Sequence, residues 1–384
     1  MSASTISRWE PSRISAIAKD VRDISENSRD YIVPRSALSA IDTPEGIALQ
    51  FTKPDGDIGT YVPSPHAIRQ LGSSLRMSGN YISRLRDAGS AGHLALLALN
   101  LRTLLQLEPG KSHMVRTISN RARAVLSDSY KTVDNWSILK SALQAVSAAG
   151  GEVWNLRHDL DGGLFRFQAW NPEVREMMKE RPNTIIRPGQ DGGDPYLYPV
   201  ISVGNSETGT GASDASIGTL DGFCSNTMLW SKEVARVHLG RKKDAGEYLA
   251  SDETRQLEGQ MVVSQISDLI KTAFSPNAFS ELVRKINASK DLEIPSDVKM
   301  VKLVNATCKL HGISDDLAEN MLESFLARGD RSAYGLGSAV NSLARPQAGI
   351  KLSDSQAVSL EETAGNIMRM NSRSWGSLLA LASA

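Results

Sequence analysis

Apolar positions divide the chain into a region of mixed pattern up to about residue 243 and a region of helical pattern after it. In the first 60 residues, prolines and charges interrupt short apolar pieces, and only residues 46–51 alternate enough to predict an edge strand. From residue 64 to about residue 86, apolar residues recur at helical spacing behind a Ser-Pro pair that suits a helix start. Residues 91–107 are continuously small or aliphatic, which predicts a buried helix.

The middle of the chain alternates with period two, which is the spacing of β-strands. This pattern predicts strands in residues 113–119, 121–126, 152–156, 164–170 and 196–203 and within 217–230. Between the second and third of these strands, Asp134 and Asn135 predict the start of a helix that ends at Gly150 and Gly151. Helical spacing then predicts helices in residues 252–274, from 276, in 295–310, from 314 and in 353–370.

These elements predict an α+β protein, with a mixed, mainly antiparallel sheet, packed helices and an all-helical C-terminal unit. A chain of 384 residues exceeds what one hydrophobic core usually organises. We therefore expect an N-terminal segment of unassigned structure in residues 1–60, an α+β core domain in 61–243 and a helical domain in 244–384.

Composition narrows the class of protein. The 43 basic and 43 acidic residues balance, so no overall field attracts the chain to nucleic acid or to an anionic membrane. No apolar run is long enough to span a membrane, because Asn100 and Arg102 interrupt the longest one. Cys224 and Cys308 match neither a disulfide framework nor a metal site. We expect a cytoplasmic protein without membrane contact.

The glycine-rich segment 204–211 follows an apolar strand, and polar residues at strand ends often build a binding surface. It lacks the Lys-Ser or Lys-Thr of a P-loop and the third glycine of a dinucleotide fingerprint, so we expect an ordinary strand-end loop within residues 204–216. Residues 183–195, which are also rich in polar and glycine residues, predict another loop. Glu207 alone is a poor metal ligand, and the six histidines show no metal-ligand spacing. No catalytic residue, cofactor or metal is assigned, and a non-enzymatic function is favoured.

Basic residues concentrate between residues 61 and 145, with eleven Lys or Arg against four Asp or Glu. Alternation places Arg121 and Arg123 on one face of a strand, and Arg116 joins them if the hairpin register permits. Such a face suits a phosphate backbone; the alternative is a solvated face paired with local acids. The candidate nucleic-acid-binding residues are Arg116, Arg121, Arg123, Lys131, Asn135, Asn205, Asn226, Arg236, Arg241, Lys242 and Lys243.

Three separated motifs and one later segment carry a resemblance to a known family. They are Val-Leu-Ser-Asp-Ser-Tyr-Lys-Thr-Val-Asp-Asn in residues 125–135, Val-Gly-Asn-Ser-Glu-Thr-Gly in 203–209, Phe-Cys-Ser-Asn-Thr-Met in 223–228 and Tyr-Gly-Leu-Gly-Ser-Ala-Val-Asn-Ser in 334–342. In order and spacing they resemble a large phage- and plasmid-borne family catalogued as a domain of unknown function, over roughly residues 110–345. One departure is Thr227 after Asn226, where that family tends to have glycine.

The resemblance implies a role near replication or recombination of mobile elements in a bacterial cell, and a distant fold-level likeness to single-strand annealing proteins of the Red-beta, RecT and Erf class. The leading hypothesis is a homo-oligomeric protein that binds single-stranded DNA on a basic sheet surface and assists annealing or recombination. A second is a metal-dependent enzyme acting on nucleotides or nucleic acid, with Glu207 close to another carboxylate. A third is a protein-binding or assembly component with an exposed apolar patch on its helical unit.

Overall fold

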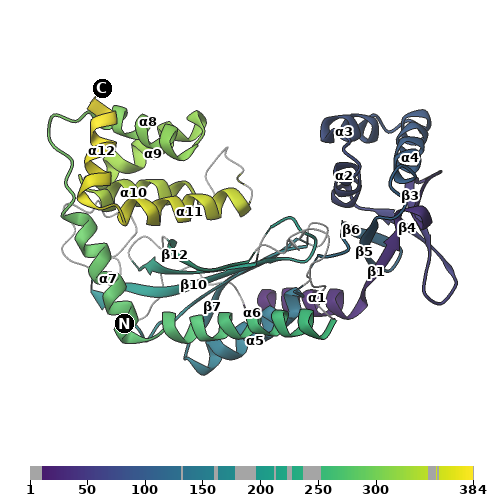
Figure 1. Ribbon diagram of the computed structural model, residues 1–384. Coiled ribbons are helices and arrows are strands. Elements are labelled where there is room, and N and C mark those ends of the chain that lie inside the picture. Colours follow the sequence, from purple (N-terminus) through teal and green to yellow (C-terminus); the bar gives the residue numbers. More distant parts are fainter. Residues whose placement is uncertain are drawn as a thin grey trace.

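The computed structural model describes residues 11–130, 133–159, 163–177, 196–211, 213–222, 227–236, 252–344, 352 and 354–383. These residues form two six-stranded sheets and a C-terminal group of helices, so the predicted α+β class is confirmed. Figure 1 shows the first sheet with its three helices at one end of the molecule, the second sheet in the middle and the C-terminal helices at the opposite end.

The first sheet is built mainly by the N-terminal segment that the sequence left unassigned. Its strands follow the order β1 (Ser28–Pro34), β5 (Ser112–Ile118), β6 (Arg121–Ser127), β4 (Ile58–Pro63), β3 (Gly46–Thr52) and β2 (Ser39–Thr43). Neighbours are antiparallel except β4 and β6, which are parallel. The predicted boundary at residue 61 therefore falls inside a strand. The segment predicted as an edge strand is β3, which lies between β2 and β4.

Three helices pack on the first sheet: α2 (Pro65–Ser74), α3 (Gly79–Ala88) and α4 (Ala91–Leu105). The single helix expected over residues 64–86 is two helices, because α2 ends in a left-handed turn at Arg76, whose φ is 61°. The amide of Met77 then donates to the carbonyl of Gly72 at 2.8 Å, which closes the helix end. Helix α4 is buried on one side only, since Leu96 and Leu99 keep 43% and 48% of their surface exposed.

The second sheet has the order β12 (Thr227–Arg236), β11 (Ser213–Asp221), β10 (Tyr196–Ser206), β8 (Leu164–Trp170) and β7 (Glu152–His158), with β9 (Glu176–Met177) beside β10. One face packs against α1 (Pro11–Asn27), α5 (Asn135–Ala148) and α6 (Asp252–Ala273) through a core that includes Phe165, Phe167 and Ile201. Helix α6 therefore belongs with this sheet, although the predicted boundary at residue 244 assigned it to the helical domain.

The C-terminal helices are α7 (Pro276–Lys290), α8 (Met300–His311), α9 (Asp315–Arg328), α10 (Ala333–Leu343), α11 (Asp354–Met368) and α12 (Ser372–Ser383). Helices α8 to α12 have a core of their own, which buries Cys308. Helix α11 also lies on β12, where a side chain at Gly365 would collide with the backbone of Leu229. Within the described part of the chain, no helix combines the length and the apolar character needed to cross a bilayer.

Candidate functional site

Two of the arginines predicted to bind DNA are buried and paired with carboxylates. Arg116 and Arg123 each expose only 3% of their surface. Arg116 forms ion pairs with Asp30, at 3.6 Å, and with Asp134, and Arg123 pairs with Glu207 at 3.0 Å. The prediction that these two residues line an exposed basic sheet face is therefore wrong.

A β-bulge and the partners' distance along the chain explain the error. The register of β5 and β6 pairs Arg116 with Ala124 and Thr117 with Ala122, so Arg123 is skipped. A bulge breaks the alternation of side chains on which the sequence argument depended. Two of the three compensating acids lie outside residues 61–145, in which the charges were counted: Asp30 is on β1, and Glu207 is at the end of β10, 84 positions from Arg123. The third, Asp134, was counted, but its contact with Arg116 is not visible in a count of charges.

Glu207 is held by two elements rather than open to a ligand. One carboxylate oxygen accepts the backbone N–H of Asn135 at 2.8 Å, and the other accepts the Arg123 guanidinium. The Asn135 side chain donates to the carbonyl of Gly163 at 3.1 Å and accepts the side-chain amide of Asn205 at 2.8 Å. Both asparagines are almost completely buried. Their predicted contact with bases or sugars is therefore wrong, because their polar groups bind the protein itself.

We call this cluster the charged joint; it comprises Asp30, Arg116, Arg123, Asp134, Asn135, Asn205 and Glu207. It lies where the first sheet meets the end of β10, and neighbouring contacts reinforce it. The carbonyl of Thr208 accepts the side-chain amide of Gln70 at 2.6 Å and lies 3.0 Å from Nε2 of His66. The hydroxyl of Tyr130 donates to the carbonyl of Ser206 at 3.1 Å. The expected strand-end loop is the turn at residues 207–211 after β10, in which residues 207–208 are buried beside these contacts and residues 209–211 are exposed.

Burial shifts the pKa values of ionisable groups in and beside the charged joint. Desolvation raises the pKa of Asp30, and the attraction of Arg116 opposes that rise. Desolvation also lowers the pKa of His66 and of His158. Among the described residues, no three His, Cys, Asp or Glu side chains come close enough together to hold a metal ion. With both oxygens of Glu207 occupied, the joint has the character of a structural ion-pair network.

The other predicted residues are dispersed. Arg121 is exposed at the start of β6, away from the buried positions of its neighbours. Arg236 is the last residue of β12, where the structure describes the backbone alone. Lys131, Asn226, Arg241, Lys242 and Lys243 lie outside the described residues, as does the loop expected in residues 183–195. No continuous basic track on the sheet is formed by the residues that can be placed.

The second sheet carries a polar strip that the sequence analysis missed. Arg166, Gly204 and Asp214 are aligned across β8, β10 and β11, and the guanidinium crosses the glycine to pair with Asp214 at 3.0 Å. A Cβ at Gly204 would lie 2.5 Å from the Asp214 carboxylate and 2.7 Å from the Arg166 guanidinium carbon. The glycine is therefore required for this pair. The only indication of this strip in the sequence is that Gly204 opens the glycine-rich segment, directly before Asn205.

Helix α11 adds an ionisable group to this strip. Glu361 accepts the side-chain amide of Gln168 at 3.4 Å. Desolvation raises the pKa of Glu361 to about 7, although Arg166 and Arg157 act in the opposite direction and Glu362 adds to the rise. The docking of α11 on the sheet is thereby linked to pH in the neutral range.

Exposed positive charge lies on the helices of the first sheet. Residues 65–105 contain five arginines and one acidic residue, Asp87. Asp87 already pairs with Arg86 at 2.8 Å. The remaining arginines are exposed, and we call them the arginine layer: Arg69, Arg76, Arg84 and Arg102. The sequence count had included these residues, but the prediction had assigned the binding surface to the strands.

Comparison of the chain with protein-family models, with curated proteins and with solved structures finds no match. The resemblance to the phage- and plasmid-borne family, and the DNA-binding role attached to it, therefore stay predictions.

Proposed function

We propose that the protein binds single-stranded DNA on helices α2 to α4, through the arginine layer, and in this way assists strand annealing or recombination. The observation that carries the proposal is the excess of positive charge in residues 65–105, where the single acidic residue, Asp87, already pairs with Arg86. Exposed guanidiniums without nearby carboxylates suit phosphate groups, and binding of this kind depends strongly on salt.

The backbone at Arg76 supports a functional role for its side chain. Arg76 occupies the left-handed region at the end of α2, a position where glycine is usual because a Cβ there is unfavourable. An arginine at this position costs about 1 kcal/mol relative to an unstrained residue. Its side chain is exposed, so packing does not offset the cost. Contact with a ligand gives a physical reason for the arginine.

The helices that carry the arginine layer also carry an exposed aromatic side chain. Tyr81, near the start of α3, keeps 39% of its surface exposed. The side-chain amide of Asn100 on α4 donates to its hydroxyl at 2.9 Å, which orients the ring. Exposed aromatic rings beside arginines are the usual platform for unpaired bases, with stacking worth roughly 1–3 kcal/mol per base.

Fluorescence anisotropy with a labelled oligothymidylate at several salt concentrations tests the proposal. We expect affinity to fall as salt rises, and each arginine removed to lower the magnitude of the salt slope by about 0.7, the value for one phosphate contact on a single strand. Arg76→Gly is the sharpest variant, because it weakens binding without lowering the unfolding free energy. Tyr81→Ala weakens binding further, whereas Tyr81→Phe retains the ring and most of the affinity.

Lys302→Gln is the matched control, since it removes one exposed cation from α8, in the C-terminal helices. It leaves affinity and salt slope unchanged. Affinity for the oligonucleotide that is absent, insensitive to salt, or equal in wild type and Arg76→Gly refutes the proposal. Equal or tighter binding to a duplex of the same length refutes its single-strand part.

A further inference from the structure

A cavity of about 660 Å³ lies where the second sheet meets the C-terminal helices. Its walls come from β11 and β12, from α7 and from the junction between α11 and α12. The volume falls within the roughly 300–1,000 Å³ that is typical of small-molecule sites. None of its lining residues belongs to the arginine layer or to the charged joint.

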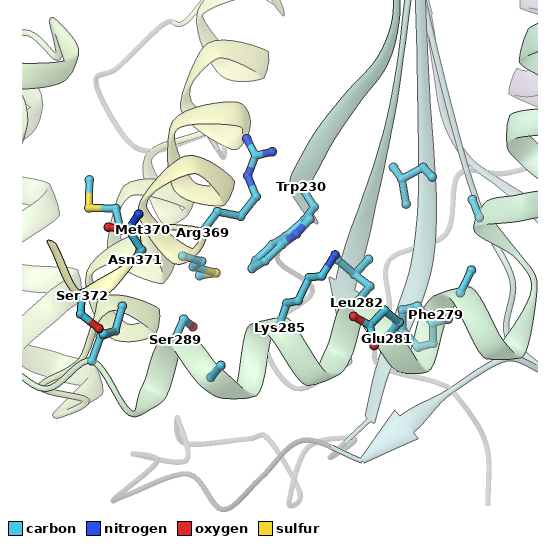
Figure 2. Close-up of a pocket in the computed structure, with 16 residues that line it drawn as sticks. Trp230, Phe279, Glu281, Leu282, Lys285, Ser289, Arg369, Met370, Asn371 and Ser372 are labelled. Carbon is cyan, nitrogen blue, oxygen red and sulfur yellow. The ribbon is translucent and has the colours of Figure 1, made fainter. Parts of the chain in front are cut away.

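The inner wall of the cavity is apolar. Trp230, Phe279, Leu282 and Met368 line it, and each exposes less than a tenth of its surface. Figure 2 shows the Trp230 indole lying between Lys285, on α7, and Arg369, at the end of α11. Aromatic and methionine side chains adapt to flat or flexible apolar ligands. The wall therefore suits a ligand with an apolar body.

The rim of the cavity is positively charged. Lys285 and Arg369 line the rim, and Glu281 is the acidic residue among the described lining residues. Glu281 is matched by Arg284, at 2.7 Å on the same helix, and Arg369 donates to the amide oxygen of Asn366. Two cations with one already paired acid favour a ligand that carries negative charge.

We propose that this cavity binds an amphipathic organic anion. Its chain or ring system lies against Trp230, Phe279 and Met368, and its carboxylate lies at the rim that Lys285 and Arg369 line. Such a ligand is separate from the DNA of the proposed function, and its site joins the second sheet to α7 and α11.

Isothermal titration of the full chain with decanoate, and with decan-1-ol of the same chain length, tests the proposal. We expect one decanoate site, with affinity at least about tenfold higher than for the alcohol, because the alcohol lacks the charge that the rim attracts. Replacing both cations, in Lys285→Gln with Arg369→Gln, removes this difference. Ala278→Trp, at an exposed position in the wall, blocks the cavity and abolishes binding of both compounds.

Arg373→Gln is the matched control, because it removes an exposed cation next to the lining residue Ser372 without being part of the lining. It leaves decanoate binding unchanged, and the unfolding midpoint of each variant shows that it is folded. Absence of decanoate binding, equal affinity for the alcohol, or binding that survives Ala278→Trp overturns the proposal. Decanoate affinity that is the same in the double variant and in wild type also overturns it.

Discussion

The Arg123–Glu207 pair allows the charged joint to be tested by changing one charge at a time. The two side chains expose 4% and 1% of their surface, so both charges are out of water. Glu207→Gln keeps the size of the side chain and an oxygen for the backbone N–H of Asn135, but it leaves the guanidinium buried without its carboxylate. Breaking a buried ion pair in this way typically costs about 3–5 kcal/mol. We expect the unfolding free energy to fall by that amount.

The double variant Arg123→Met with Glu207→Gln isolates the charge effect. It removes both charges, fills the site with an apolar side chain of similar length and retains the acceptor for Asn135. Replacing a buried pair with well-packed neutral residues is often neutral or stabilising. We therefore expect the double variant to recover to within about 1 kcal/mol of wild type.

Urea unfolding, followed by tryptophan fluorescence and by circular dichroism, measures these free energies, with urea chosen because it does not screen charges. A Glu207→Gln variant within about 1 kcal/mol of wild type contradicts the assignment of the joint as a structural ion-pair network. A double variant as unstable as the single one contradicts it as well, since the loss then comes from packing and not from an unpaired charge.

Two further predictions concern the polar strip of the second sheet. Glu361 has a pKa of about 7 in the folded chain and 4.5 as its ordinary value, so the folded state binds the extra proton and the unfolding free energy falls as pH rises from about 5 to 7. In urea unfolding at pH 5 and pH 8, Glu361→Gln removes this fall, which is at most about 3 kcal/mol, and an unchanged pH dependence disproves the linkage. Gly204→Ala lowers the thermal midpoint, by a loss of about 1–3 kcal/mol from overpacking, whereas Gly211→Ala, whose nearest neighbour is 3.8 Å away, changes it little. Equal midpoints for the two alanine variants are incompatible with the crossing of Arg166 over Gly204.

Local pattern was sufficient to predict much of the secondary structure. Alternation in residues 113–126 predicted β5 and β6, and capping residues predicted the start of α5 at Asn135. These signals come from side chains within a few residues of one another, so they are present in the sequence itself. The first 60 residues gave weaker signals because β1 to β4 are short and interrupted by prolines and charges, and their pairing with β5 and β6 depends on distant segments.

The candidate site depended on contacts that local pattern does not contain. A single bulge beside Arg123 altered which side chains of β6 are buried, and Asp30 and Glu207 neutralise arginines far from them in sequence. Of the basic residues counted in 61–145, four exposed arginines lie on helices α2 to α4 and not on the strands. Their place on α2 to α4 follows only from knowing which side chains face solvent.

The long separation between Arg123 and Glu207 has a consequence for how the protein is made. Eighty-four residues must be synthesised after the arginine before its carboxylate exists. At translation rates of about 5–20 residues per second, this interval lasts roughly 4–17 s. The first sheet is therefore translated well before the end of β10 that anchors it, and until then the Arg123 guanidinium on β6 lacks its carboxylate. Completion of the N-terminal half thus waits for the middle of the polypeptide to leave the ribosome.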